Sequence, residues 1–363
     1  MSAQDTILEA HALTKHFGGG GFGFARQPLI RAVDGVSFAV RRGETFAIVG
    51  ESGCGKSTLA RVLLRLLAPT SGTVSFDGAD VTSAGAREMR ALRREMQIIF
   101  QDPYSSLNPR MTVGALVGEP LAVHGVARGA ALAGRVHELL RTVGLAPEHA
   151  RRYPHEFSGG QRQRIGIARA LACGPRLVIG DEPVSALDVS IRAQIINLLE
   201  DLKHELGFTL VLVAHDLALI RHTSDRVAVM YLGRIVELAD AQALFDAPAH
   251  PYTRMLLSAI PVPVPGARGA RELPQGDPPS PADPPPGCRF HTRCAFAQPA
   301  CREASPELQA LAPGHLVACH RAQDLPSQAS AAIMSHPARD SRRRRRQSIY
   351  NSDAQPRAGA ADP

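Results

Sequence analysis

The sequence lacks the features that carry a chain into or across a membrane. No run of 18 or more apolar residues occurs in its 363 residues, so we expect no membrane-spanning helix. The start, Met1 to Asp5, has neither a basic segment nor an apolar core, so we expect no secretory signal. A chain without such a signal is expected in a reducing compartment, where structural disulfides are rare. We therefore expect the six cysteines to form none. At 44% hydrophobic residues, the chain can bury a large core in about two or three domains.

A glycine-rich loop between an expected strand and an expected helix organises the chain. It reads G-x-x-x-x-G-K-S, and its residues are Gly50, Glu51, Ser52, Gly53, Cys54, Gly55, Lys56, Ser57 and Thr58. Glycines let the backbone fold around an anion, and the helix that follows adds its positive end. We expect Lys56 to reach the β- and γ-phosphates of a nucleotide and Ser57 to bind Mg²⁺. The alternative is a chance glycine turn, which the strand and helix on either side disfavour.

Strands and helices alternate along much of the sequence. Apolar runs at 45–49, 177–180 and 208–213 predict buried strands, and an apolar stripe predicts a long helix after Asp188. This alternation is typical of a parallel sheet covered on both faces. Ligands of such sheets lie beyond the carboxyl ends of the strands. We therefore expect five residues that follow strands to meet at one edge: Lys56, Gln101, Asp181, Glu182 and His215.

A nucleotide triphosphatase also needs a metal ligand, a base for the attacking water and a sensor of the γ-phosphate. We assign these roles to Asp181, Glu182 and His215, respectively. Gln101 can contact Mg²⁺ or water at the border of a helical segment. The alternatives are that Asp181 and Glu182 form a solvated turn, that His215 is a core histidine and that Gln101 is an ordinary surface residue. Their place in a P-loop protein favours the functional roles.

A second anion-binding turn is predicted where two glycines follow a serine at the start of a helix: Ser158, Gly159, Gly160 and Gln161. One chain has no need of two γ-phosphate sites. We therefore expect a head-to-tail pair, in which this helix covers the ATP that a partner's P-loop holds.

Together these motifs resemble the nucleotide-binding subunit of ATP-binding cassette (ABC) transporters. The resemblance covers residues 7–260 and rests on 50–58, Gln101, 158–161, 177–182, 185–188 and His215. It implies an α/β P-loop NTPase core, in which a parallel sheet has helices on both faces, with an N-terminal antiparallel β subdomain. It also implies a helical subdomain at about 102–172, ATP hydrolysis coupled to transport, and a nucleotide contact by Asp188. Phe17 falls where the family places an aromatic that stacks on adenine; a packing role is the alternative.

Four segments are similar, more narrowly, to the ATPases of dipeptide and oligopeptide importers: 100–110, 153–157, 181–190 and 250–253. The Val184-Ser185 pair resembles the second of the two ATPase subunits in such importers. The resemblance implies a heterodimer with a related ATPase, two membrane permease subunits and an extracytoplasmic peptide-binding protein. It places the chain on the cytoplasmic face of the inner membrane as a peripheral protein. Nickel and glutathione importers share this subfamily, so those cargoes stay open.

Beyond residue 260 the composition changes. Residues 261–286 hold ten of the 28 prolines and predict a linker, which leads into a cysteine-bearing extension ending near 322. Residues 323–363 have few apolar side chains and include Arg342 to Arg346, so we expect a disordered basic tail.

The extension offers a set of metal ligands. Cys288, Cys294, Cys301 and Cys319 are separated by 5, 6 and 17 residues, and four thiolates can hold zinc or an iron–sulfur cluster. Residues 287–294 resemble the C-terminal extension of the importer family, which implies a 4Fe–4S site. Zinc, with His291, His315 or His320 as substitute ligands, and thiols without metal are the alternatives. We interpret Cys54 and Cys173 as packing residues.

Two other classes of ABC protein, soluble members and exporters, agree less well with the sequence. A soluble ABC protein could use Arg342 to Arg346 on nucleic acid, but that run supplies part of the net charge of +7, which makes basicity weak evidence. About 100 residues separate the P-loop from Ser158 without sustained heptads, unlike DNA-repair members, and translational members carry two cassettes. The importer segments also disfavour an exporter. We therefore expect no nucleic-acid partner.

Overall fold

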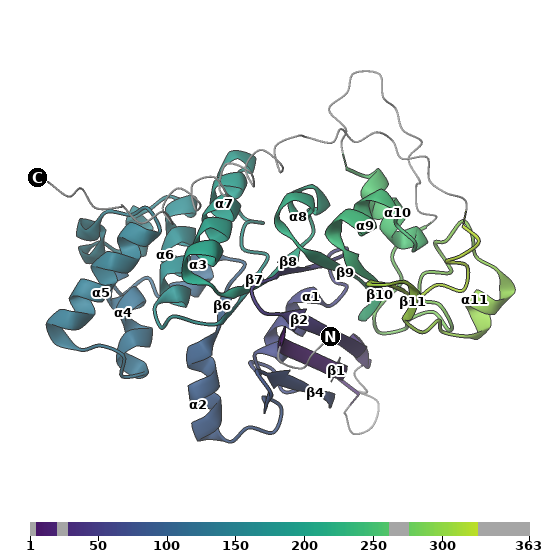
Figure 1. The fold of residues 1–363 in the computed structure, drawn as a ribbon, viewed down its shortest axis with the longest axis horizontal. Coiled ribbons are helices and arrows are strands. Elements are labelled where there is room, and N and C mark those ends of the chain that lie inside the picture. Colours follow the sequence, from purple (N-terminus) through teal and green to yellow (C-terminus); the bar gives the residue numbers. More distant parts are fainter. Residues whose placement is uncertain (1–4, 20–27, 261–275, 326–363) are drawn as a thin grey trace, which may run out of the picture.

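The computed structural model describes residues 5–19, 28–260 and 276–325. Within these residues a four-stranded antiparallel sheet and an eight-stranded sheet both contact helix α1 (Lys56–Leu63) (Figure 1). The smaller sheet has the strand order β2 (Ile30–Arg41), β1 (Thr6–Phe17), β4 (Ser71–Phe76) and β5 (Ala79–Asp80). The larger has the order β11 (Gln309–Ala312), β12 (His315–Val317), β10 (Arg234–Asp240), β9 (Arg226–Tyr231), β3 (Thr45–Val49), β8 (Thr209–Ala214), β7 (Leu177–Asp181) and β6 (Met96–Ile99).

The central strands of the larger sheet are buried on both faces. On β3, Phe46 and Ile48 belong to a core shared with α1 and the antiparallel sheet. Ala47 and Val49 belong to the other core, shared with the helices that cover the opposite face. Because side chains alternate along a strand, a continuous apolar run is what a strand between two cores requires. This confirms the α/β fold that the sequence predicts.

The larger sheet is mixed rather than wholly parallel. Strands β9, β3, β8, β7 and β6 pair in parallel, whereas β10, β12 and β11 are antiparallel. The reversal follows from a tight turn at Leu232 and Gly233, both with positive φ, which pairs β10 directly with β9. Strands β11 and β12 come from the extension, so the extension continues the edge of the main sheet (Figure 1).

Helices gather at the β6 end of the sheet (Figure 1). They are α3 (Pro103–Ser106), α4 (Val113–Val123), α5 (Gly129–Thr142), the 3₁₀ turns at Pro147–Arg151 and Pro154–Glu156, and α6 (Gly159–Leu171). They lie within the range expected to be helical. The others are α2 (Ala86–Glu95), α7 (Val189–Leu206), α8 (Leu217–Thr223), α9 (Ala241–Asp246), α10 (Pro251–Ser258) and α11 (Pro299–Glu303).

Some expectations fall outside the described residues. They are the first part of the proline-rich linker and the tail from 326 onward. Over the part of the chain that the structure describes, no helix combines the length and the apolarity needed to cross a bilayer.

Candidate active site

The P-loop is packed tightly against neighbouring backbone. Gly50 (φ +155°) and Gly55 (φ +107°) have dihedral angles that L side chains rarely adopt. A Cβ atom on Gly50 would lie 2.2 Å from the carbonyl oxygen of Met230, and one on Gly55 would lie 1.9 Å from that of Ala32. Both positions therefore require glycine.

Lys56 begins α1, and its side chain is buried under the loop. Its Nζ atom donates to the backbone oxygens of Gly50 at 2.8 Å and Glu51 at 3.0 Å, and lies 3.9 Å from the sulfur of Cys54. Burial raises the pKa of the Cys54 thiol, so Cys54 is protonated at neutral pH. This agrees with a packing role for Cys54. The tip of the loop, Ser52 and Gly53, is exposed.

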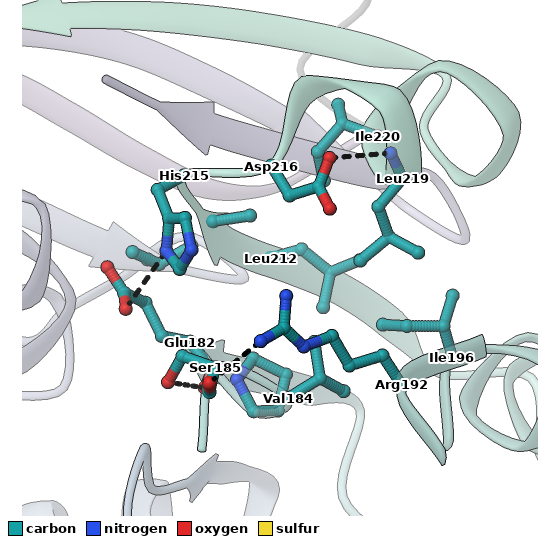
Figure 2. A pocket seen from close by; sticks show the side chains of 13 residues that line it. Glu182, Val184, Ser185, Arg192, Ile196, Leu212, His215, Asp216, Leu219 and Ile220 are labelled. Carbon is teal, nitrogen blue, oxygen red and sulfur yellow. Dashed lines mark hydrogen bonds and ion pairs between the residues drawn. The ribbon is translucent and has the colours of Figure 1, made fainter. Parts of the chain in front are cut away.

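Glu182 is the centre of the predicted site. Its carboxylate accepts a hydrogen bond from Gln101 Nε2 at 3.0 Å, and its oxygens lie 3.3 Å from His215 Nδ1 and 3.8 Å from Lys56 Nζ. Figure 2 shows His215 facing Glu182 at the rim of a pocket. Residues from the ends of four strands therefore lie together, as the strand pattern predicts. Their chemical roles stay predictions.

The backbone at Glu182 is strained. Its φ of +47° lies in the left-handed region, which costs a non-glycine residue of the order of 1–3 kcal/mol. Hydrogen bonds hold it there: Glu182 N donates to Val213 O at 3.0 Å, and the amide and hydroxyl of Ser185 donate to Glu182 O at 3.2 and 3.1 Å. The sequence gives no signal for this strain, which fixes the direction of the Glu182 side chain.

Asp181 has the surroundings of a metal ligand. The Asp181 side chain is fully buried. Among the described residues, neither of its carboxylate oxygens has a partner at the distance and angle of a hydrogen bond. Burial raises the pKa of Asp181, opposed by its neighbours Ser57 and Arg61, whose Nε lies 4.0 Å away. A buried carboxylate whose neighbours compensate its charge only weakly is costly, and a cation would lower that cost. The residues Ser57, Gln101 and Asp181 therefore fit Mg²⁺ in donor type.

Phe17 lies at the end of β1, where it is 36% exposed. The Nζ atom of Lys15 lies 5.1 Å from its ring centroid. An exposed ring is available for stacking on a base. The adenine contact of Phe17 stays a prediction.

The turn at Ser158 closes its own hydrogen bonds. Gln161 N donates to Ser158 Oγ at 3.3 Å, and Ser158 N donates to Gln161 Oε1 at 3.0 Å, which is a capping box. Ser158 is exposed, and Gly159 and Gly160 are partly buried. In Figure 1, α6 lies on the opposite side of β6 and β7 from α1. Ser158 is thus presented at the surface at the start of α6.

The segment between β7 and α7 is held by an arginine. Arg192 donates to the backbone oxygens of Leu187 at 2.7 Å and Ser185 at 3.3 Å, beneath the pocket in Figure 2. Asp188 is exposed at the N-cap position of α7, and its side chain makes no capping hydrogen bond. Its expected nucleotide contact stays a prediction.

Comparison with known proteins settles the family. A family model described as ABC transporter matches residues 33–185, and one described as Oligopeptide/dipeptide transporter, C-terminal region, matches residues 236–301. The oligopeptide transport ATP-binding protein AppF of Bacillus subtilis is 51% identical over 321 residues, which is 87% of this chain and 98% of that protein. The chain belongs to the ATP-binding subunits of ABC transporters. This ABC ATPase therefore hydrolyses ATP in a reaction coupled to transport.

Further relatives agree with this placement of the ABC ATPase. A Sinorhizobium fredii protein named "Probable peptide ABC transporter ATP-binding protein y4tS" is 54% identical over 318 residues, covering 87% of this chain and 90% of that protein. A solved dimeric structure of the ATP-binding cassette MJ0796, described as a post-hydrolysis state bound to ADP and Pi, matches with a TM-score of 0.58 and 31% identity. That match covers 65% of this chain and 99% of that chain.

The four cysteines of the extension line one small cavity. Burial raises the pKa of Cys288 to about 11 and raises the pKa values of Cys294 and Cys319, so these thiols are protonated at neutral pH. All six cysteines are free. Within residues 5–19, 28–260 and 276–325, however, no group of three or more His, Cys, Asp or Glu is arranged to hold a metal ion. The structure therefore does not support the predicted 4Fe–4S or zinc site.

The substitute histidine ligands have other partners. His315 Nε2 lies 2.7 Å from Glu237 Oε1 on β10, so this side chain is part of a buried polar pair. His291 Nδ1 bonds to the Cys288 oxygen at 2.8 Å, and His320 Nε2 to the Ala304 oxygen at 2.9 Å. The suggestion that His315 could ligate zinc is not supported, because it does not line the cysteine cavity.

Two supports of the P-loop were missed from the sequence. Glu51 N donates to the Tyr252 hydroxyl at 2.8 Å, and the Glu51 carboxylate pairs with Arg293. Both partners lie more than 200 positions away in the chain. The His250-Pro251-Tyr252 segment was noted only for its resemblance to importers, and no signal pointed to Arg293.

Proposed function

We propose that this ABC ATPase powers the import of dipeptides and oligopeptides. The match of residues 236–301 to the C-terminal region of oligopeptide and dipeptide transporters supports the cargo class. Relatives named for peptide and oligopeptide transport, at 51 to 54% identity over 87% of the chain, support it too. The single observation that carries the enzymatic part is the meeting of Gln101, His215 and Lys56 at the Glu182 carboxylate.

In this proposal the chain pairs with a related ABC ATPase, and the pair binds two permease subunits that receive peptide from an extracytoplasmic binding protein. The Ser158 turn supports pairing, because Ser158 is exposed at the start of α6, where a helix N-terminus can bind a phosphate held by another chain. The ATPase would lie on the cytoplasmic face of the inner membrane and reach the bilayer through the permeases.

The residues divide the chemistry as follows. P-loop N–H groups and Lys56 hold the β- and γ-phosphates, and Phe17 stacks on the adenine. Ser57, Gln101 and Asp181 would hold Mg²⁺, which would supply positive charge at the phosphate oxygens. Glu182 accepts a proton from the attacking water, and His215, half-exposed beside it, contacts the γ-phosphate.

A chain of contacts leads from Glu182 to the helices near β6. Gln101 bonds to Glu182, and Asp102 Oδ1 next to it accepts from Tyr104 N at 2.8 Å at the start of α3. The Arg162 guanidinium of α6 lies 3.9 Å from the Tyr104 ring centroid. We propose that nucleotide-driven movement of Gln101 reaches the permeases through these helices.

The test uses the complete transporter in proteoliposomes with ATP inside. The Glu182→Gln variant should bind ATP normally while turnover falls at least about 100-fold, since it lacks the base. Retained steady-state hydrolysis would refute the role of Glu182. Wild-type transporter should take up labelled dipeptide; uptake of nickel or glutathione in its place would show that the cargo assignment is wrong.

We also propose that the four extension cysteines bind metal, as a 4Fe–4S cluster in preference to zinc, with a structural role. The four thiols line one cavity, and thiols that are protonated without metal lose their protons when a metal binds, so their raised pKa values are compatible with this proposal. Chain purified without oxygen should contain iron and acid-labile sulfide, and Cys301→Ser should lose both. Absence of iron and zinc from the wild-type chain would refute the proposal.

A further inference from the structure

The loop from Cys288 to Cys294 carries two arginines that reach the nucleotide-binding half of the molecule. Arg293 is 5% exposed. Its Nη1 and Nη2 donate to Glu51 Oε2 at 2.8 Å and Oε1 at 3.0 Å. This two-point geometry fixes both the position and the plane of the carboxylate, which a lysine could not do. The hydrogen bond from Arg293 to Glu51 also raises the pKa of Arg293.

Glu51 is held at three points, and two of them set the P-loop. Its amide donates to the Tyr252 hydroxyl at 2.8 Å, and its backbone oxygen accepts from Lys56 Nζ at 3.0 Å. Its carboxylate is held by Arg293. The position of Glu51 therefore determines the start of the phosphate loop and the direction of the Lys56 ammonium group.

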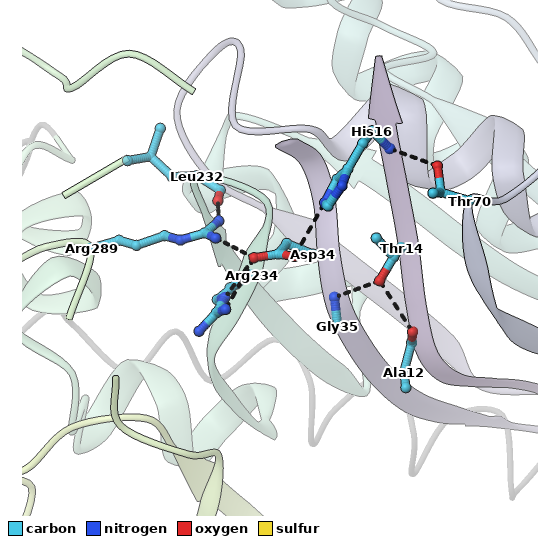
Figure 3. A network of polar contacts seen from close by, with 9 residues as sticks. All are labelled: Ala12, Thr14, His16, Asp34, Gly35, Thr70, Leu232, Arg234 and Arg289. Carbon is cyan, nitrogen blue, oxygen red and sulfur yellow. Dashed lines mark hydrogen bonds and ion pairs between the residues drawn. The ribbon is translucent and has the colours of Figure 1, made fainter. Parts of the chain in front are cut away.

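The second arginine reaches the strand beside Phe17. Arg289 pairs with Asp34 on β2 and donates to the Leu232 carbonyl oxygen (Figure 3). Asp34 also accepts from Arg234 at 3.0 Å and lies 3.3 Å from His16 Nε2, next to Phe17. Burial alone would raise the pKa of Asp34, but the charges of Arg289 and Arg234 outweigh it and hold the pKa below its usual range.

The turn that Arg289 holds also touches the P-loop. Gly233 N, next to Leu232, donates to the Cys54 backbone oxygen at 2.8 Å, and Gly233 O accepts from Asp34 N at 2.9 Å. The two arginines thus act from one loop on both sides of the nucleotide-binding region. One supports the phosphate loop, and the other supports the strand pair that ends at Phe17.

The loop itself is built to be rigid. His291 N donates to Cys288 O at 3.0 Å and Arg293 N to Phe290 O at 3.0 Å, while Cys288 N donates to Cys301 O at 2.8 Å. The Phe290 ring packs on Tyr231, with the two ring centroids 5.3 Å apart, and the Arg293 guanidinium lies 6.0 Å from its centroid. A rigid loop loses little entropy when it fixes a partner.

We infer that Arg293 is a positioning residue for ATP: through Glu51 it fixes the P-loop, so ATP affinity depends on the C-terminal extension. The inference deepens the proposed ATPase function and rests on it. Arg293 acts on Lys56 only through Glu51, and its described contacts do not include Glu182, Gln101 or His215, so its loss should weaken ATP binding much more than the hydrolytic step.

The test measures ATP affinity of the full chain with a fluorescent ATP analogue, and KM and kcat of the assembled transporter. For Arg293→Ala we expect Kd and KM to rise about tenfold, the size of one lost charged hydrogen-bond pair, while kcat changes less than about threefold. Arg293→Lys should fall between Arg293→Ala and wild type. Arg302→Ala, at an exposed arginine of α11 in the same extension, is the matched control and should bind like wild type.

A double-mutant cycle separates positioning from general stability. Glu51→Ala should match Arg293→Ala, and the double variant should be no worse than either single one. Wild-type affinity in Arg293→Ala, or fully additive losses, would overturn the inference. If Arg293→Ala does not fold, Arg293→Lys decides: weakened binding supports the inference, and unchanged binding overturns it. Failure of wild type to bind ATP more tightly than Lys56→Ala would overturn the proposed function itself.

Discussion

Two glycine turns lead into helices α1 and α6, and their surroundings differ in kind. Around the P-loop, added Cβ atoms on Gly50 and Gly55 would meet backbone oxygens at 2.2 and 1.9 Å. Around the turn at Ser158, added Cβ atoms would meet side chains and no backbone: Leu187 at 3.4 Å from Gly159 and Ile191 at 2.8 Å from Gly160. The first turn is enclosed by backbone of its own chain, whereas the second packs on side chains, closes its own hydrogen bonds and leaves Ser158 exposed. We interpret backbone enclosure, as at the P-loop, as typical of a site that is complete within one chain. An exposed residue such as Ser158 is what a site shared with a partner requires.

The largest effect should come from breaking the enclosed turn. In Gly55→Ala, a Cβ cannot lie 1.9 Å from the Ala32 oxygen, and φ of +107° adds strain, so the loop must move. We expect ATP affinity of the single chain to fall at least about 100-fold, measured by equilibrium binding, because the N–H groups that bind phosphate lose their arrangement.

Gly134→Ala is the matched control for that loss. Gly134 lies in α5 with nothing within 4 Å of an added Cβ, and alanine favours a helix by about 0.5–1 kcal/mol over glycine. It should bind ATP normally and unfold at a slightly higher temperature. Wild-type ATP affinity in Gly55→Ala would show that the enclosure of the P-loop is not what binding requires.

A smaller effect, visible only in the assembled pair, should come from the exposed turn. Ser158→Ala removes a hydroxyl expected to face a partner's phosphate, and a hydrogen bond to a charged group contributes about 1.5–3 kcal/mol. Turnover of the transporter should fall roughly 10- to 100-fold. ATP affinity of the separate chain should not change.

Ser158→Thr tests whether the hydroxyl or the helix cap matters. Threonine keeps an oxygen that can accept from Gln161 N, so stability should be kept and turnover largely restored. Weakened ATP binding by the separate Ser158→Ala chain would contradict the division between an enclosed site and a shared one.

The meeting of Gln101, Glu182 and His215 could be predicted from the sequence for a simple reason. Strands of a parallel sheet end at one edge, so residues directly after them converge whatever their separation in the chain. The left-handed backbone of Glu182 could not be predicted, because hydrogen bonds from Ser185 and to Val213 impose it. The local sequence pattern predicts the convergence of residues that follow strands. The backbone conformation of Glu182 depends on tertiary contacts, which that pattern does not show.

The C-terminal extension also has tertiary contacts that the sequence pattern does not predict. Its cysteines are visible in the sequence, and the structure brings them to one cavity. The pairing of Arg293 with Glu51, 242 positions apart, is a tertiary contact between the extension and the P-loop. Nothing in the composition of that segment predicts this pairing, since short strands with few apolar residues give a weak pattern.

The smallest expected effect is a change of folding stability with pH, which involves the support of the P-loop and not the turn at Ser158. The P-loop is supported through Tyr252 by His250, whose Nδ1 accepts from Tyr252 N at 3.0 Å. Burial lowers the pKa of His250 to about 4, below the ordinary 6.5, so the folded chain keeps it neutral. Between these values the unfolded chain binds more protons, so stability is fully present above about pH 6.5 and falls as pH drops toward 4. The capping box at Ser158 holds no group that titrates there.

Urea unfolding of the full chain at pH 7.5 and 5.5 measures this contribution. One pH unit below the ordinary pKa should cost about 1 kcal/mol of unfolding free energy through His250. Glu237 accepts from His250 N at 2.9 Å and its Oε1 lies 2.7 Å from His315 Nε2, so the quantity that matters is the difference from His250→Asn. Asparagine keeps an acceptor for Tyr252 N and cannot titrate, so its pH dependence should be smaller by about that amount. Equal dependence in the two proteins would mean that acid weakens the fold elsewhere and that the P-loop support is not sensitive to protonation.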